Sequence, residues 1–364
     1  MRPGAWLPRG ILEPMRALTY HAPGDLRVET VEDPGIRAPT DAIVAIRLAA
    51  ICGSDLHVWH GRERGLDAGT IMGHEFIGEV VEIGRGVSRV RVGARVVSPF
   101  TTSCGVCYYC VNNLPARCDQ GQLFGWVERG AGLHGGQAEL VRVPLADSTL
   151  VAVPDALADE SAILLGDVLS TGYHGAVMGG VSAGTVALVV GCGPVGLMAV
   201  LAARELGAAR VFAVDAVPER LALARDMGAE TLPLGSEAGL DLLRSATQGR
   251  GADAVLEAVG SPEASRLAFD LVRPGGVIAA VGVHHESAFP FSPGQAYDKN
   301  LTYRIGRCPA RHYMERLLPL AERRHAELRA LFTHRVPLRD APAAYQMFDT
   351  KADGCVKVAL DPGS

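Results

Sequence analysis

The sequence predicts an α/β protein in which a mainly antiparallel β domain is followed by a doubly wound parallel sheet domain. Two patterns predict this. Short β-type runs broken by Gly, Pro and Asp fill residues 15–154, and from about residue 185 buried apolar runs alternate with helical segments. The first pattern is typical of antiparallel sheets and the second of βαβ units. A chain of 364 residues has room for two domains with substantial cores.

The first domain, placed at residues 15–165, is predicted from five β-type segments. Each is rich in apolar or β-branched residues and ends near Gly, Pro or Asp. They span residues 15–31, 42–51, 76–84, 94–100 and 138–144. Because Met15 begins the first of them, we expect residues 1–14 to be a disordered extension or the product of an upstream start codon.

The second domain, placed at residues 166–308, is predicted from strands that alternate with helices. Pro218 and Pro262 suit the first turn of a helix, and Ser261 is a candidate cap for the second of these helices. The expected strands are 186–190, 210–215, 252–259 and 277–283, and the expected helices are 194–206, 218–227 and 262–272. The remaining residues, 309–364, combine a helical run with a β-like run, and we expect them to return to the first domain.

The charge pattern argues against nucleic acid and membrane partners. The chain has 35 basic and 40 acidic residues, a net charge of −5 and no long run of either sign. Residues 169–203 carry no Asp, Glu, Lys or Arg, but glycines divide them into a short strand and a helix, which favours a buried core over a membrane span. No export signal is visible at the N-terminus, so we expect a cytoplasmic protein with small-molecule chemistry.

A glycine-rich loop predicts a dinucleotide site. It directly follows the apolar run 186–190 and opens a helix, and the next strand ends in Asp215, about twenty residues on. The first Gly permits the turn, the second lets the backbone approach a pyrophosphate, and the third lets the helix pack closely. Asp215 would bind the ribose hydroxyls and favour NAD over NADP, whereas the nearby Arg220 weakens that preference. The loop residues are Gly191, Gly193, Pro194, Val195 and Gly196.

Four cysteines predict a structural zinc site. Four thiolates on one short loop complete a tetrahedral shell and leave no open position, so the ion should hold the loop. With no export signal, such clustering favours a metal over disulfides. The alternative is a group of reduced structural cysteines. The four residues are Cys104, Cys107, Cys110 and Cys118.

Two further segments complete a family resemblance. Cys52 lies in Cys-Gly-Ser-Asp-Leu-His and His74 in Gly-His-Glu. Taken alone, neither residue indicates a site, because a single cysteine is usually a small core residue and a single histidine usually a hydrogen-bonded polar residue. Together with the cysteine loop and the glycine fingerprint, in this order, they make the chain resemble the zinc-dependent medium-chain alcohol dehydrogenases from Met15 onward. The resemblance implies a GroES-like catalytic domain, a Rossmann domain, NAD, and two zinc ions per chain, one catalytic and one structural.

The resemblance also implies the ligands of the catalytic zinc. Cys52 and His74 would be two of them, and Asp167 occupies the third position, as in the family's Cys-His-Asp subgroup. Glu75 would be a carboxylate able to bind or release the ion, or else only a neighbouring acid. Asp55 would orient His74 or serve as a simple turn acid.

The mechanism implied is hydride transfer between an alcohol, or an aldehyde hydrate, and NAD, with zinc as Lewis acid. The proton would leave through Ser54, the cofactor ribose and His57, which we expect to reach solvent and titrate near neutrality. Ser54 as a turn cap and His57 as a surface residue are the alternatives. Thr171 falls where relatives contact the nicotinamide, and Lys357 where relatives place a cation near the pyrophosphate.

The substrate remains open at this stage. Residues 123–126 and 135–139 resemble the formaldehyde-dehydrogenase-like branch, and a polyol or threonine dehydrogenase is the alternative. A non-catalytic NAD-binding protein is the alternative outside the enzymes. Trp59, Phe100 and Trp126 are candidate pocket walls or core residues. Family habit suggests a homodimer or homotetramer.

Overall fold

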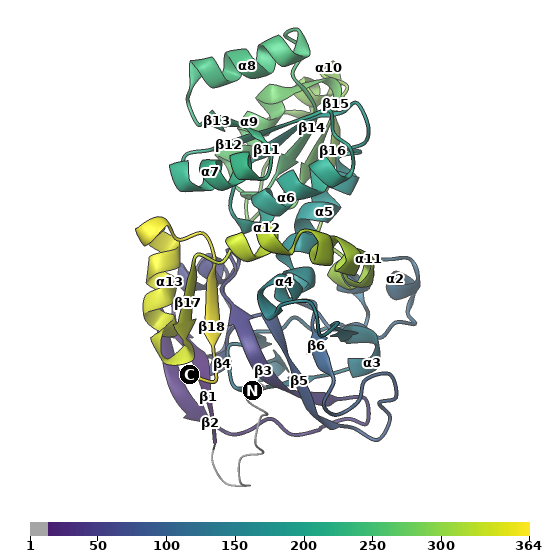
Figure 1. Ribbon diagram of the computed structural model, residues 1–364, viewed down its shortest axis with the longest axis vertical. Helices are drawn as coiled ribbons and strands as arrows, with labels where there is room; N and C mark the ends of the chain where they lie inside the picture. The colour runs from purple at the N-terminus through teal and green to yellow at the C-terminus, as the bar shows by residue number, and fades with distance from the viewer. Residues whose placement is uncertain (1–13) are drawn as a thin grey trace.

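The computed structural model describes residues 14–364, which form two bodies stacked along the long axis (Figure 1). The upper body holds a parallel sheet covered by helices, and the lower body holds sheets that are mainly antiparallel. The predicted fold class is therefore confirmed. We expected residues 1–14 to be a disordered extension or the product of an upstream start codon. Of these, residues 1–13 lie outside the part of the chain that the structure describes. Within residues 14–364, no helix has both the length and the apolar character needed to cross a membrane.

The upper sheet has six parallel strands in the order β13-β12-β11-β14-β15-β16. Counted from β11, this is 3-2-1-4-5-6, the order of doubly wound dinucleotide-binding sheets. Leu188 on the central strand lies opposite Phe212 on one side and Val255 on the other. The strands are β11 Val186–Val190, β12 Arg210–Asp215, β13 Glu230–Pro233, β14 Ala252–Glu257, β15 Val272–Ala280 and β16 Thr302–Ile305.

Helices cover both faces of this sheet because its central strand is apolar on both sides. Ala187 and Val189 pack into the core that includes α5 and α6, whereas Leu188 and Val190 pack into the core of α8 and α9. As predicted, a proline starts α7 and α9, and Ser261 caps α9. The helices of this body are α5 Val168–Met178, α6 Pro194–Glu205, α7 Pro218–Asp226, α8 Glu237–Thr247, α9 Pro262–Leu271 and α10 Pro293–Asp298.

The lower body is built on a seven-stranded sheet with the path β10-β6-β5-β3-β18-β17, and β9 pairs with β3. A three-stranded sheet, β2-β1-β4, and the hairpin of β7 and β8 complete it. The first strand begins at the predicted Met15. The strands are β1 Met15–Ala22, β2 Asp25–Val31, β3 Ala42–Ala50, β4 Thr70–Ile71, β5 Glu75–Ile83, β6 Arg95–Val97, β7 Trp126–Glu128, β8 Ala131–Leu133, β9 Leu140–Val143 and β10 Val151–Ala152.

The C-terminal segment joins the two bodies. It forms α11 Ala310–Arg323, α12 His325–Ala330, β17 His334–Pro337, η3 Leu338–Asp340, α13 Ala341–Thr350, η4 Ala352–Gly354 and β18 Val358–Asp361. Because β18 pairs antiparallel with β3, the yellow end of the chain lies beside its purple beginning in Figure 1. One apolar core runs from Ile77 through Leu165 to Leu197 and Leu317. The boundaries placed at residues 165 and 308 stay predictions, since this core crosses both.

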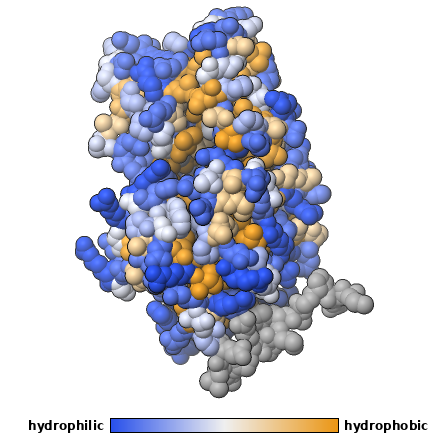
Figure 2. All heavy atoms as spheres, turned by 90° about the vertical axis from the view of Figure 1, so that its left-hand side faces the viewer, coloured by the Kyte–Doolittle hydropathy of each residue, from blue (hydrophilic) through white to orange (hydrophobic). Residues whose placement is uncertain are grey.

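The lower body also contains several short helices. They are α1 Asp55–Trp59, α2 Tyr108–Val111, η1 Pro115–Arg117, α3 Ala146–Thr149, α4 Asp159–Ile163 and η2 Leu164–Gly166. The face turned to the viewer in Figure 2 carries apolar side chains (orange) along the middle of the upper body, bordered by hydrophilic ones (blue). Apolar surface therefore remains beside the junction.

Candidate active site at the junction of the two bodies

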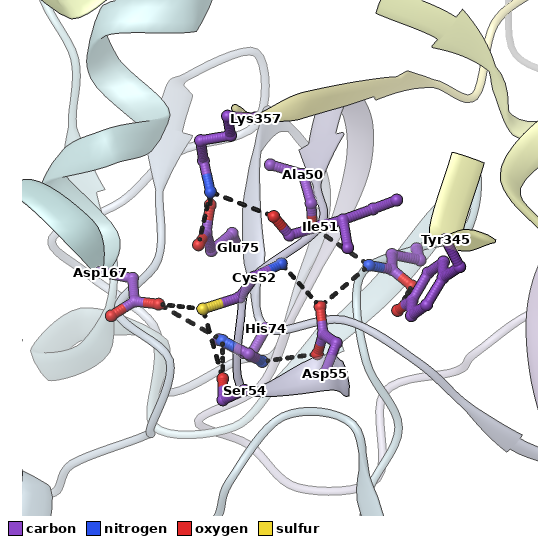
Figure 3. A network of polar contacts seen from close by, with 11 residues as sticks. Ala50, Ile51, Cys52, Ser54, Asp55, His74, Glu75, Asp167, Tyr345 and Lys357 are labelled. Carbon is purple, nitrogen blue, oxygen red and sulfur yellow. Dashed lines mark hydrogen bonds and ion pairs between the residues drawn. The ribbon is translucent and has the colours of Figure 1, made fainter. Parts of the chain in front are cut away.

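Three side chains from distant parts of the chain point toward one another (Figure 3). Cys52 follows β3, His74 precedes β5, and Asp167 directly precedes α5. Sγ of Cys52 lies 3.2 Å from Oδ2 of Asp167, and Nε2 of His74 lies 3.3 Å from the same oxygen. The structure thus brings together the three predicted ligands, although 115 residues separate Cys52 from Asp167.

The chemistry of this group fits a divalent zinc ion. Ligand atoms of Cys52, His74, Glu75 and Asp167 all lie within 4.8 Å of one another, and all four residues are buried. Burial, and next the charge of Asp167, raise the pKa of the Cys52 thiol to about 12. A cation at the centre would counter this penalty on the thiolate. Thiolate, imidazole and carboxylate are the donors that zinc takes in proteins.

Local structure explains why these residue types stand here. Gly73, before His74, has φ +90°, and a Cβ there would lie 2.3 Å from the side chain of Gln137. Only glycine fits. Asp55, in the first turn of α1, accepts a hydrogen bond from the Cys52 amide at 2.9 Å, and its other oxygen lies 3.2 Å from Nδ1 of His74. One carboxylate therefore positions two of the candidate ligands.

Two residues that we did not assign to the site support Asp55. Gln137 donates to Oδ2 of Asp55 at 3.4 Å and to the carbonyl of Ala50 at 3.1 Å. Tyr345, fully buried on α13, donates to the Gln137 side-chain oxygen at 2.8 Å. No local pattern marks Tyr345, because it reaches the site only through the return of the C-terminal segment.

Lys357 does not lie where we expected it. Both Lys357 and Glu75 are completely buried, and Nζ of Lys357 lies 2.7 Å from Oε2 and 2.9 Å from Oε1 of Glu75. Nζ also donates to the carbonyl of Ile51 at 3.2 Å. This lysine is absent from the lining of the cofactor cleft. Its place is explained by the buried carboxylate, which requires a compensating cation.

Ser54 and His57 lie on α1 or at its start, and both line the cleft. Oγ of Ser54 lies 3.3 Å from Sγ of Cys52 and 3.3 Å from Nε2 of His74. His57 differs from expectation, because burial and the neighbouring His285 lower its pKa to about 4. Its Nδ1 is buried without a hydrogen-bond partner among residues 14–364. The histidine is thus neutral near pH 7.

A cleft of about 1420 Å³ joins these residues to the carboxyl edge of the parallel sheet. Thr171, Phe100 and Trp126 line it, whereas Trp59 packs against Tyr345 in the lower core. Where the cleft passes the glycine loop, the backbone leaves room for a ligand. Pro194 and Val195, at the start of α6, also line this part.

The three glycines of the loop have different surroundings. Gly191 has φ +88°, and a Cβ there would lie 2.3 Å from Val259. A Cβ at Gly196 would lie 1.7 Å from the carbonyl oxygen of Gly191. At Gly193 a Cβ would meet only the guanidinium of Arg220, at 3.8 Å. The first and third glycines are thus required by packing, while the second faces open space that fits a pyrophosphate at the helix N-terminus.

Asp215 and Arg220 frame the far end of the cleft. Oδ2 of Asp215 accepts a hydrogen bond from the Cys192 amide at 2.6 Å, and Oδ1 accepts one from the Val217 amide at 2.8 Å. Asp215 therefore holds the loop as well as facing the cleft. Nε of Arg220 is buried without a partner among the described residues, beside the same space.

The four clustered cysteines form a second group with ligand geometry, separate from the cleft. Their sulfur atoms lie within 4.8 Å of one another. Backbone amides donate to these sulfurs, among them Cys104 N to Cys118 Sγ at 3.2 Å and Cys107 N to Cys104 Sγ at 3.3 Å. Amides of Asp119 and Cys110 lower the pKa of Cys107 to about 7, which favours its thiolate. The donor set fits a Cys₄ zinc.

Comparison with known proteins matches this arrangement. The chain fits the family description "Alcohol dehydrogenase GroES-like domain" over residues 38–155 and "Zinc-binding dehydrogenase" over residues 194–323. It is 46% identical to the medium chain reductase/dehydrogenase ucsI of an Acremonium species, covering 78% of this chain and 98% of that one. It is 41% identical to zinc-type alcohol dehydrogenase B of Aspergillus flavus, covering 92% and 79%.

Among solved structures, alcohol dehydrogenase TADH from Thermus sp. ATN1 superposes with a TM-score of 0.89 at 39% identity, covering 95% of this chain and 99% of that one. The glutathione-independent formaldehyde dehydrogenase of Pseudomonas aeruginosa is 33% identical over 95% of this chain and 97% of its own length. Since this likeness is weaker than those above, the formaldehyde branch stays a prediction. The chain belongs to the zinc-dependent medium-chain alcohol dehydrogenase family.

Proposed function

We propose that this protein transfers hydride between an alcohol, or an aldehyde hydrate, and NAD. The observation that carries the proposal is the convergence of Cys52, His74 and Asp167 at the wall of the cleft that also contains Gly193. A metal and a dinucleotide held by these residues would share one space. A polyol or threonine dehydrogenase is the alternative substrate assignment within the same chemistry.

A bound zinc would supply Lewis acidity to the substrate oxygen, and bound NAD would supply the hydride acceptor. The chain itself supplies orientation. Asp55 fixes Nδ1 of His74 as the nitrogen that faces away from the cleft, so that Nε2 faces Cys52 and Asp167. Thr171, which donates to Oδ1 of Asp167 at 3.1 Å, lines the cleft and would meet the nicotinamide end.

Ser54 and His57 are proposed as the two ends of a proton path. The Ser54 hydroxyl lies beside two candidate ligand atoms, so it is placed to take a proton from a substrate oxygen there. His57 lies one turn along α1 in the same cleft, with a free Nδ1. No hydrogen bond joins the two side chains in the part of the chain that the structure describes. The link between them stays a proposal.

Asp215 supports the preference for NAD. Its carboxylate at the end of β12 would accept hydrogen bonds from ribose hydroxyls and repel a 2′-phosphate. Arg220 works against this preference. We also propose a cytoplasmic protein, supported by eight cysteines that are all free. A homodimer or homotetramer is supported by β16, which is an open edge of the parallel sheet.

The test is a screen for NADH formation by the zinc-loaded protein across primary and secondary alcohols, diols, polyols and aldehydes. We expect turnover that Asp167→Ala abolishes and that Asp155→Ala, an exposed acid outside the cleft, leaves unchanged. Absence of NADH with every class, from protein shown to contain both metals, would contradict the proposal. A strong preference for polyols would select the alternative assignment.

A further inference from the structure

Arg117 and Arg307, which the proposed reaction does not use, both line the cleft. Arg117 ends η1 in the cysteine lobe of the lower body, and Arg307 lies between β16 of the upper body and α11. Neither guanidinium makes a hydrogen bond or ion pair with any residue from 14 to 364, and both residues are exposed where they line the cleft. Two uncompensated cations therefore face one space.

These arginines lie at the metal end of the cleft and not at the nucleotide end. Cys308, next to Arg307, has its thiol beside Thr171 and Asp167. In the sheet order, β16 stands at one edge, and β12, which carries Asp215, stands on the other side of the central strand β11. Arg307 is thus placed where a substrate, rather than the adenosine of a dinucleotide, would extend.

At the metal end of the cleft, positive charges outnumber negative ones. Burial, and next the charge of Arg117, lower the pKa of Arg307, and only Glu63 opposes them. The carboxylate and thiolate of Asp167 and Cys52 would be balanced by a divalent ion, and Glu75 is paired with Lys357. Glu63 remains as a negative charge at this end, and one carboxylate does not balance two guanidinium groups. A cleft with an excess of positive charge at one end attracts a ligand of negative charge there.

We propose that the substrate of this enzyme carries an anionic group, a carboxylate or a phosphate, and that Arg117 and Arg307 bind it at the end remote from the reacting hydroxyl. Arginine presents two parallel N–H donors that match carboxylate and phosphate oxygens. Residues from both bodies would then hold the substrate across the cleft. This inference rests on the proposed function, because it assumes that the hydroxyl of the same molecule meets the metal.

The test compares molecules of equal length that differ only in charge. With the zinc-loaded enzyme and NAD, kcat/KM is measured for 4-hydroxybutyrate, 4-hydroxybutyl phosphate and 1,4-butanediol, and for the same three classes with three, five and six carbons. We expect at least one anionic series to exceed the diols by about tenfold or more, and the better anion identifies the group recognised. Arg117→Gln and Arg307→Gln should each lower this anion-to-diol ratio by about tenfold.

Arg91→Gln is the matched control, since Arg91 is exposed, its guanidinium makes no hydrogen bond or ion pair with residues 14–364, and it lies outside the cleft. It should leave the ratio unchanged. Equal kcat/KM for diols and anions in the wild type, or an unchanged ratio in both cleft variants, would overturn the inference. A loss of NADH affinity in these variants as large as the loss for the anion would assign the arginines to the cofactor instead, and so would also overturn it.

Failure of the proposed function gives a different result. If no alcohol yields NADH, calorimetric binding of 4-hydroxybutyrate and 1,4-butanediol to the NADH-loaded protein still tests the arginines. Tighter binding of the anion, lost in Arg307→Gln and kept in Arg91→Gln, would support the inference about the ligand alone. Equal binding of the two molecules would reject it.

Discussion

Oδ1 of Asp55 lies 3.2 Å from Nδ1 of His74, while the other oxygen of the same carboxylate accepts a hydrogen bond from the Cys52 amide. One buried acid therefore sets the orientation of two candidate metal ligands. Gln137 and Tyr345 hold that acid in turn, so the network extends from the site to α13 (Figure 3). Such supporting hydrogen bonds fix the tautomer of a ligating histidine and raise its basicity.

The first prediction concerns this acid. Asp55→Asn keeps the shape of the side chain but removes its charge, so the orientation of His74 should weaken. We expect zinc affinity at the catalytic site to fall by about 10- to 100-fold. Competition with a chromogenic chelator measures it, and the structural zinc, whose ligands are unchanged, provides an internal reference. Unchanged affinity would show that Asp55 acts only as a turn residue.

The second prediction concerns the number of ions. Elemental analysis of the wild type should find about two zinc ions per chain, and Asp167→Ala should retain about one. The structural ion should instead be lost from the Cys107→Ser protein, because that change removes one ligand of a closed four-sulfur shell. An Asp167→Ala protein that keeps both ions would contradict the assignment of this carboxylate.

The sequence predicted elements where a local physical signal exists. The apolar run 186–190 became β11, and the helix after the glycine loop begins at Pro194. Ser261 caps α9 by accepting from the Ala264 amide at 3.2 Å. Each of these depends on neighbouring residues only. The convergence of Cys52 with Asp167 has no local signal, and it was reached through resemblance to a family.

Two expectations were wrong because burial is not visible in a short pattern. Lys357 was placed beside the pyrophosphate, yet it is paired with Glu75 inside the core. His57 was expected to titrate near neutrality, yet burial and His285 depress its pKa to about 4. The position of Lys357 and the pKa of His57 both depend on which residues pack around them in three dimensions. Glu75, the partner of Lys357, is 282 residues away in the sequence.

The third prediction concerns cofactor choice. Asp215→Asn should lower kcat/KM for NAD by more than tenfold relative to NADP, since the repulsion of a 2′-phosphate disappears. The amide oxygen of asparagine can still accept from one of the two backbone amides, those of Cys192 and Val217, that donate to the carboxylate. Steady-state kinetics with both cofactors and one alcohol measures the ratio. A ratio of kcat/KM for NAD to kcat/KM for NADP equal to that of the wild type would show that Asp215 does not recognise the ribose.

The fourth prediction concerns the buried ion pair. Lys357→Met leaves the Glu75 carboxylate buried without its cation and should reduce the free energy of unfolding by about 3–5 kcal/mol. Urea titration of the metal-free protein gives this value. The double variant Lys357→Met with Glu75→Gln should recover much of the loss, because no charge then remains unpaired. Equal losses in the single and double variants would refute the electrostatic explanation.

The fifth prediction concerns acid stability. Burial, and next the charge of His312, lower the pKa of His174 to about 4, while an unfolded histidine titrates near 6.5. Between these values the unfolded chain binds the proton and the folded chain does not. His174 should therefore contribute a loss of stability as pH falls from about 6.5 to about 4, and none above that window. The full effect is bounded at about 3 kcal/mol.

His174→Asn isolates this contribution, because asparagine can still bond the Tyr313 hydroxyl that lies 3.1 Å from Nδ1 of His174, but does not take up a proton. Urea titrations of both proteins are compared at pH 7.5 and pH 5. Loss of metal at low pH affects both proteins alike, so it cancels in the difference. The wild type should lose more stability than the variant over this interval. Equal losses in the two proteins would mean that His174 takes up a proton as readily in the folded chain as in the unfolded one.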